Sequence, residues 1–116
     1  MSNLSIAYPS SYSDAVAMLK GKPRTKVGHN TWLLLQGSSV CLVYHKTAIV
    51  TYHAEHTKLD NGGYYSVTTK ARLDGAMRAL GIGGISQRKG SWYFTFTSGN
   101  ELPYVNGQVF YTGCKP

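Results

Sequence analysis

The sequence predicts one α+β domain, in which an antiparallel sheet of about five to seven strands carries two helices packed on it. Three observations predict this class. The chain has 116 residues, and single domains mostly run ~100–150 residues. Thirteen Gly with only four Pro favour a turn-rich β chain over a helical bundle. Two segments have helical signals, and no repeat or linker divides residues 1–116, so we expect a single globular domain.

A short first helix is predicted over residues 14–20. Ser11 or Ser13 is suited to cap its start, and Asp14 favours the N-terminal end of a helix. Gly21 supplies the left-handed residue that ends it. The residues expected to face the core are Tyr12, Val16 and Leu19.

The middle of the chain alternates strand and turn signals. A turn at Gly37–Ser38 separates two apolar runs and predicts a hairpin. The Asn61-Gly62 pair, within a turn at Lys58–Gly63, is a strong signal for a second hairpin. The strands expected in this region cover residues 31–36, 40–44, 47–53 and 64–67.

A second helix over residues 69–80 has the clearest pattern, with Thr68 and Thr69 as candidate caps. The apolar stripe at i, i+3, i+4 and i+7 consists of Leu73, Ala76, Met77 and Leu80. The side chains expected off that face are Lys70, Arg72, Asp74 and Arg78. Gly75 costs up to ~1 kcal/mol inside a helix, which indicates close packing or a functional reason at this position.

The last third is again β-rich. Trp92, Phe94 and Phe96 alternate with more polar residues, as in a half-buried strand. Lys89-Gly90 is a turn before it, and Ser98–Gly107 is a loop after it. The strands expected here cover residues 84–88, 92–97 and 108–111.

The charge balance points to a polyanionic partner. Twelve Lys and Arg against five Asp and Glu give a net charge of +7, which suits nucleic acid, an anionic membrane or an acidic protein surface. Solubility alone also tolerates such a charge. The candidate binding residues for nucleic acid or another partner are Lys20, Lys22, Arg24, Lys26, Thr69, Lys70, Arg72, Arg78, Arg88 and Lys89.

Two features of these cations suggest phosphate contacts. The four cations from Lys20 to Lys26 occupy every second position, so an extended backbone places them on one side. The step Thr68-Thr69-Lys70-x-Arg72 places hydroxyls and cations beside the N–H groups of a helix start, which forms a competent anion site. The alternative is plain capping with solvated basic side chains. We expect the cations of both segments to form one patch.

Catalytic and metal chemistry are not expected. The sequence has no Gly-x-Ser-x-Gly elbow, and its five acids are scattered. His53-x-Glu55-His56 is the candidate metal cluster, with His29 and His45 nearby, but on a continuous strand its two histidines point to opposite faces. They converge only if the strand ends in a turn. We therefore predict a protein that is not an enzyme, with no metal and no cofactor.

The remaining sequence features concern thiols and targeting. Cys41 lies in an apolar run and is expected to be buried and inert; its bridging to Cys114 is the alternative to two unpaired thiols. Residues 1–13 have neither the basic nor the apolar segment of a signal peptide. No run approaches the ~18–20 apolar residues of a membrane span. We expect a soluble protein of the host-cell cytoplasm, with no membrane partner.

The central block resembles a known group of proteins. It consists of Asn30-Thr31, His45-x-Thr47-x-Ile49-Val50-x-Tyr52, Leu59-Asp60-Asn61-Gly62-Gly63-Tyr64 and Val67-Thr68-Thr69-Lys70-x-Arg72. This order resembles small bacteriophage-encoded proteins without assigned biochemistry, notably those of actinobacterial phages, over roughly residues 28–74. Tyr64 stands where Trp is expected, Asp74 where Asn is usual, and residues beyond Gly99 lie outside the resemblance. The resemblance implies a phage or mobile-element origin and no catalytic residue.

Three classes of function follow. The leading hypothesis is a phage accessory protein that binds nucleic acid or a host nucleoprotein complex through a basic surface. The alternative is an anti-CRISPR-like inhibitor of a host-defence complex that acts by protein–protein contact. A small enzyme or metal protein is the third. A DNA mimic is disfavoured, because it has to be acidic.

Overall fold

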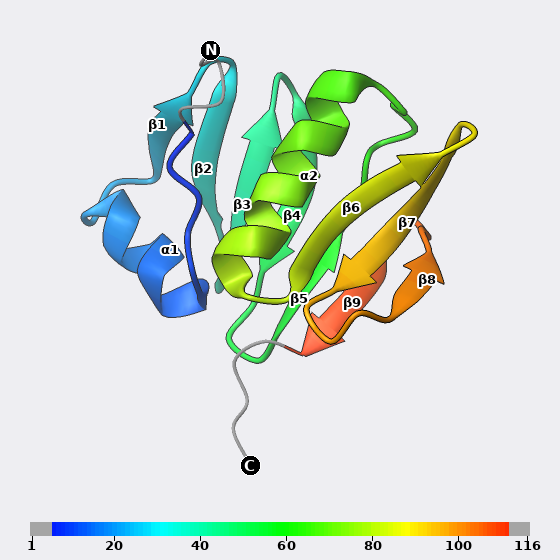
Figure 1. Cartoon of the computed structure of the whole chain (residues 1–116). Helices are drawn as coiled ribbons and strands as arrows, with labels where there is room; N and C mark the ends of the chain where they lie inside the picture. Colours follow the sequence, from blue (N-terminus) through cyan, green and yellow to red (C-terminus); the bar gives the residue numbers. More distant parts are fainter. Residues whose placement is uncertain (1–5, 112–116) are drawn as a thin grey trace.

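The computed structural model describes residues 6–111. Two helices and nine strands lie in that range (Figure 1). They are α1 (Tyr12–Leu19), β1 (Arg24–Gly28), β2 (Thr31–Gln36), β3 (Ser39–Tyr44), β4 (Thr47–Tyr52), β5 (His56–Leu59), α2 (Val67–Leu80), β6 (Gly83–Arg88), β7 (Ser91–Phe96), β8 (Glu101–Pro103) and β9 (Gln108–Tyr111). They form a six-stranded sheet ordered β1-β2-β3-β4-β5-β9 and a three-stranded sheet ordered β6-β7-β8, both antiparallel. The predicted α+β class with two helices is confirmed, and the three-stranded sheet adds to the single sheet that the sequence predicts.

The larger sheet is a five-strand meander with one late addition. Strands β1 to β5 pair with their chain neighbours, and β9 returns from the far end of the sequence to pair with β5. Helix α2 crosses in front of this sheet, and β6 runs beside α2 (Figure 1). Between residues 6 and 111, no helix is long and apolar enough to cross a membrane.

The core lies between the larger sheet and the helices. A row of register partners runs across four strands and is fully buried: Leu33, Leu42, Val50 and Leu59. Helix α2 covers this side with Leu73, Ala76 and Met77, each with no exposed surface, while Leu80 is partly buried. The predicted helical stripe is therefore confirmed as core. Each fully buried leucine, valine or methionine side chain of this core stabilises the fold by roughly 1.5–3 kcal/mol.

Helix α1 differs in detail from its prediction. Ser11 caps it, accepting a hydrogen bond from the Asp14 backbone N–H at 3.0 Å. Ala15 and Leu19 face the core, whereas Val16 is 41% exposed, so the prediction for Val16 is wrong. The helix starts two residues earlier than expected, and its left-handed C-cap is Lys20 instead of the predicted Gly21. Ala15 and Leu19, four positions apart, form its buried face.

The start of α2 also differs. Ser66 is the cap and accepts from the Thr69 N–H at 3.2 Å, so neither Thr68 nor Thr69 has that role. Arg72 is only 5% exposed, and the prediction that it lies off the buried face is wrong. The helix therefore turns one cation toward the sheet.

Three strands, β1, β5 and β8, were not predicted from the sequence, and one predicted strand is absent. Strand β5 lies where a turn from Lys58 was predicted, and β8 lies inside the loop predicted over Ser98–Gly107. The strand predicted over residues 64–67 is absent, because this segment leads into α2. The Asn61 side chain accepts from the Gly63 N–H at 2.8 Å, and this turn directs the chain to the helix instead of back along the sheet.

Gly75 shows the predicted close packing. A Cβ added there would lie 2.6 Å from the Tyr8 ring carbon Cζ. Gly75→Ala is expected to lower the free energy of unfolding by about 1–2 kcal/mol, because the clash exceeds the ~1 kcal/mol gain in helix propensity. In a Tyr8→Ala background the same change is expected to stabilise the protein. Urea unfolding of the four proteins in this double-mutant cycle measures both effects. If the effects of the two substitutions on the free energy of unfolding simply add, the contact between Gly75 and Tyr8 is contradicted.

Candidate nucleic-acid interface

The cations near β1 are exposed, but only two of them share a strand. Lys20 is the left-handed cap of α1 (φ 52°), and Lys22 follows it in the turn before β1. Arg24 and Lys26 lie on β1 itself, at alternate positions, and are exposed. The Arg24 guanidinium carbon lies 5.2 Å from the centroid of the Trp32 ring. Of the four cations at every second position, only Arg24 and Lys26 therefore share one face of a strand.

These two cations belong to the side of the large sheet that faces away from the helices. Their register partners, Leu34 and Trp32, lie on the same face. We name this surface the open face; pairing across the sheet gives its members as Arg24, Lys26, Trp32, Leu34, Cys41, Val43, Thr51, His56, Lys58, Val109 and Tyr111. Apart from Cys41, which is buried, none of them belongs to the hydrophobic core or to the partly buried side chains packed against it.

The open face is positive. Arg24, Lys26 and Lys58 lie on it, and its members include no carboxylate. The acidic residues lie on other elements or in the turns that flank β5: Asp14, Glu55, Asp60, Asp74 and Glu101. None of the three cations forms an ion pair within the described range. Their charge is therefore not compensated on the face itself.

A pair of histidine rings lies beside Lys58. His53 and His56 are stacked with ring centroids 4.3 Å apart, because β4 ends at Tyr52 and the chain turns. The pKa of His53 is lowered by partial burial, by His56 and by Lys58. This shift favours the neutral form of the His53 imidazole. Among residues 6–111, no three His, Cys, Asp or Glu side chains are grouped closely enough to hold a metal ion.

Arg72 forms a buried junction between α2 and the sheet. Its Nε donates to Thr31 Oγ1 at 2.9 Å, and its Nη2 donates to the His29 carbonyl at 3.0 Å. Its Nη1 donates to the Thr68 carbonyl at 3.1 Å. The guanidinium carbon lies 4.0 Å from the centroid of the Tyr44 ring. All these partners are part of the fold, so Arg72 holds the helix to the sheet.

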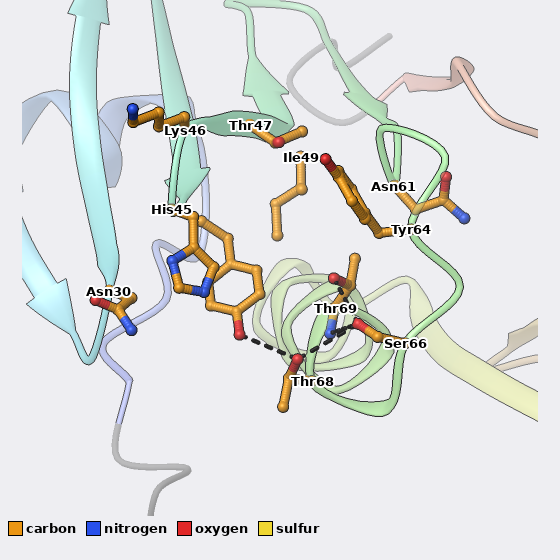
Figure 2. A pocket seen from close by; sticks show the side chains of 11 residues that line it. Asn30, His45, Lys46, Thr47, Ile49, Asn61, Tyr64, Ser66, Thr68 and Thr69 are labelled. Carbon is orange, nitrogen blue, oxygen red and sulfur yellow. Dashed lines mark hydrogen bonds between the residues drawn. The ribbon is translucent and has the colours of Figure 1, made fainter.

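A pocket of about 640 Å³ opens at the start of α2 (Figure 2). Its lining residues are Asn30, Tyr44, His45, Lys46, Thr47, Ile49, Asn61, Tyr64, Ser66, Thr68 and Thr69. The hydroxyls there bond to one another: Tyr44 donates to Thr68 at 3.0 Å, and Ser66 donates to Thr69 at 3.0 Å. Thr69 is 2% exposed. This geometry matches the plain-capping alternative for the helix start.

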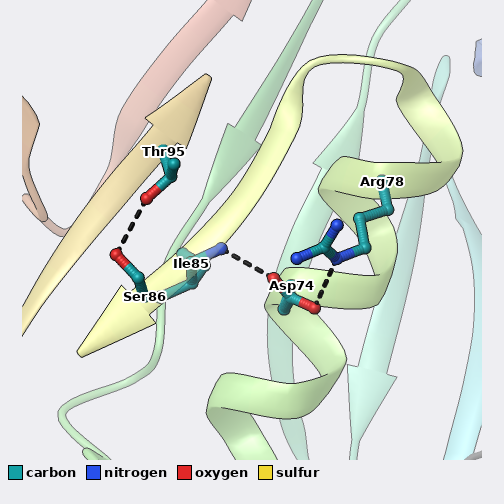
Figure 3. A network of polar contacts seen from close by, with 5 residues as sticks. All are labelled: Asp74, Arg78, Ile85, Ser86 and Thr95. Carbon is teal, nitrogen blue, oxygen red and sulfur yellow. Dashed lines mark hydrogen bonds and ion pairs between the residues drawn. The ribbon is translucent and has the colours of Figure 1, made fainter. Parts of the chain in front are cut away.

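The other predicted cations of α2 are directed to the smaller sheet. Lys70 donates to the Gln87 side chain on β6. Arg78 pairs with Asp74 at 2.9 Å, and Asp74 also accepts from the Ile85 N–H at 2.8 Å, as Figure 3 shows. These contacts join α2 to β6. They leave Lys70 and Arg78 on different elements from the cations of β1.

The last two predicted cations lie on the β6–β7 hairpin. Arg88 forms a two-point ion pair with Glu101, at 2.8 and 3.0 Å, and Lys89 is in the turn with φ 51°. The ten predicted binding residues are therefore distributed over the turn between α1 and β1, β1 itself, α2 and this hairpin. Only Arg24 and Lys26 contribute to the open face.

Several open-face residues were missed by sequence reasoning. Trp32, Lys58 and Tyr111 each occupy the non-core position of a strand. The strand pattern of residues 31–36 could have identified Trp32 as an outward-facing residue. Adjacent strand residues point to opposite faces, so Trp32 and Leu33 cannot both face the core. Cys41 is buried as expected, with 5% of its surface exposed, and its thiol lies 3.8 Å from the Thr51 hydroxyl. Cys114 lies outside the described residues.

Comparison with known proteins adds one finding. A family model described as Kyanoviridae Gp96 protein matches residues 10–111. That range includes every helix and strand of the structure. No curated protein and no solved structure matches the chain.

Proposed function

Because the chain belongs to the Kyanoviridae Gp96 family of phage proteins, we propose that it is a phage accessory protein that binds nucleic acid, free or in a host nucleoprotein complex. It acts without catalysing a reaction, in the cytoplasm of the host cell. The family match supports a phage-encoded protein; it supports neither the actinobacterial host type nor the sequence block on which that resemblance rests.

The observation that carries this proposal is the uncompensated charge of the open face. Arg24 and Lys26 are exposed and lie beside Trp32. Phosphates attract such cations, and binding releases the counterions of the nucleic acid. Of the ten candidate residues, Arg24 and Lys26 are the leading phosphate contacts, with Lys20 and Lys22 next to them in the chain. Buried Arg72 and Thr69 are left out of the proposed surface.

A second candidate function is inhibition of a host-defence complex by protein contact. It is favoured by exposed apolar side chains at the approach to α2, where Tyr64 is 62%, Tyr65 61% and Val67 74% exposed. Aromatic side chains are enriched in protein interfaces. A pull-down from host lysate separates the two functions: nuclease-sensitive recovery supports nucleic acid, and one stoichiometric host protein supports the inhibitor.

The direct test is a titration of labelled single- and double-stranded DNA and RNA at two salt concentrations. We expect log K to fall by ~0.7–0.9 per neutralised phosphate for each tenfold rise in salt. The double variant Arg24→Gln/Lys26→Gln is expected to weaken binding on all sequences and to flatten the salt slope by up to about two units.

The matched control is Arg88→Gln/Lys89→Gln. This control also removes two positive charges, but from the β6–β7 hairpin, where Arg88 is already paired with Glu101. Its affinity is expected to remain close to that of the parent protein. If no probe binds more tightly than ~10⁻⁴ M, the weak end of non-specific binding, direct nucleic-acid binding is rejected in favour of the protein target.

A further inference from the structure

We propose that the ligand of the open face is single-stranded nucleic acid, which lies across the strands with one base stacked on Trp32. This inference rests on the proposed function and specifies its substrate class. Proteins that bind single strands without sequence preference combine a positive surface for the backbone with aromatic rings for the bases. The open face brings both kinds of group together.

The first ring-and-cation pair lies at the β1 edge. Trp32 is half-buried and lies outside the core, with Lys26 and Val43 as its cross-strand partners. The Arg24 guanidinium lies 5.2 Å from its ring centroid. Neighbouring side chains thus restrict the indole, which lowers the entropy cost of stacking. When a base stacks on the Trp32 ring, the phosphate of the same nucleotide therefore lies close to the Arg24 and Lys26 cations.

A second ring-and-cation group lies at the opposite edge. Lys58 on β5 has Val109 as its partner on β9. The His56 and Tyr111 rings, which are also register partners, lie 6.3 Å apart, and Tyr111 is 82% exposed. Six strands at ~4.8 Å spacing place the two edge strands, β1 and β9, about 24 Å apart across the sheet. An extended single strand reaches both groups with a few nucleotides, and single-strand sites use ~4–16 nucleotides.

The same geometry disfavours a duplex. Reading duplex DNA requires a helix or a β-ribbon that enters a groove, whereas the open face is the flank of a six-stranded sheet. Bases inside a duplex stack on each other and leave protein rings without a partner. An acidic peptide would satisfy the cations but would make no use of Trp32 as a stacking surface. The combination of rings and cations therefore favours a single strand.

The test uses oligo(dT) of ~16 nucleotides and a duplex of the same length at the same salt concentration. Tryptophan fluorescence is a direct readout, because Trp92 is 5% exposed, with the Tyr65 and Tyr104 rings packed against it. We expect oligo(dT) to quench the emission of Trp32 and to bind at least about tenfold more tightly than the duplex. Trp32→Leu is expected to lose roughly tenfold to a hundredfold in affinity for oligo(dT), and Trp32→Phe to recover part of it.

A charge-reversal pair keeps the test decisive if Trp32→Leu does not fold. Lys58→Glu reverses a charge on the open face, and Lys89→Glu makes the same change on the β6–β7 hairpin; both lysines are exposed. Only Lys58→Glu is expected to weaken oligo(dT) binding. Equal weakening by both variants would overturn the inference.

The possible failures are distinguishable. Equal affinity for oligo(dT) and duplex, with no quenching, would overturn the single-strand inference and leave the proposed function standing. Absence of binding to any nucleic acid would overturn both. Binding of poly-glutamate as tightly as oligo(dT), with the same dependence on Trp32, would also overturn the inference and assign the face to an acidic protein segment.

Discussion

Met77→Asp is expected to leave the chain unfolded in water at 25 °C. The Met77 side chain has no exposed surface and belongs to the central core between α2 and the larger sheet. A carboxylate there would be buried without a partner, a change that costs more than ~4 kcal/mol. Total stability of a domain is only ~5–15 kcal/mol. Far-UV circular dichroism and urea unfolding should show loss of the cooperative transition.

The matched control places the same charge on an exposed site of the same helix. Val67 is 74% exposed at the N-terminal end of α2, where a carboxylate interacts favourably with the helix dipole. Val67→Asp is therefore expected to fold, with stability unchanged or raised by ~0.3–1 kcal/mol. A Met77→Asp protein with the melting temperature of the parent would show that the stripe is not core.

Arg72→Ala is expected to lower the free energy of unfolding by about 3–5 kcal/mol. The substitution removes the guanidinium N–H groups that donate to Thr31 Oγ1 and to the His29 carbonyl, and it leaves a cavity beside Tyr44. A buried polar group without its partner costs ~1–3 kcal/mol, and hydrogen bonds from a charged donor contribute ~1.5–3 kcal/mol. The urea midpoint should fall accordingly.

Two variants on the same helix complete this test. Lys70→Ala removes a cation whose contact is a surface bond to Gln87, and a change within ±0.5 kcal/mol is expected. Arg72→Lys keeps the charge but cannot reach three acceptors in a plane, so it should fall between the parent and Arg72→Ala. If Arg72→Ala and Lys70→Ala unfold at the same urea concentration, the junction has no structural role.

Local patterns were sufficient to predict much of the fold. The β2–β3 hairpin follows from two apolar runs around Gly37, and α2 follows from a stripe that includes Leu73 and Met77. Strand β5 was missed because three of its four residues are polar and its pairing with β4 and β9 was not visible in the sequence. The Asn61-Gly62 signal correctly marked a turn, but tertiary contacts decide which element follows a turn.

The candidate site depends on long-range register and was less predictable. The side-chain bond of Arg72 joins it to Thr31, 41 residues earlier, and no local signal distinguishes a buried arginine from a solvated one. Arg24 and Lys26 were identified from their spacing. Lys58 joins them on one face only through the pairing of five successive strands. Composition predicted the charge, whereas topology determines where it lies.

The late addition of β9 has a kinetic consequence. Strands β1 to β5 pair through short connections, so this part has low contact order and is expected to form early. Pairing of β5 with β9 closes a loop of roughly fifty residues, because Leu59 is opposite Gln108. The intervening α2, β6, β7 and β8 must collapse before this closure is favourable. We therefore expect the Tyr111 edge of the open face to be the last part of the sheet completed during folding, after the β1 edge.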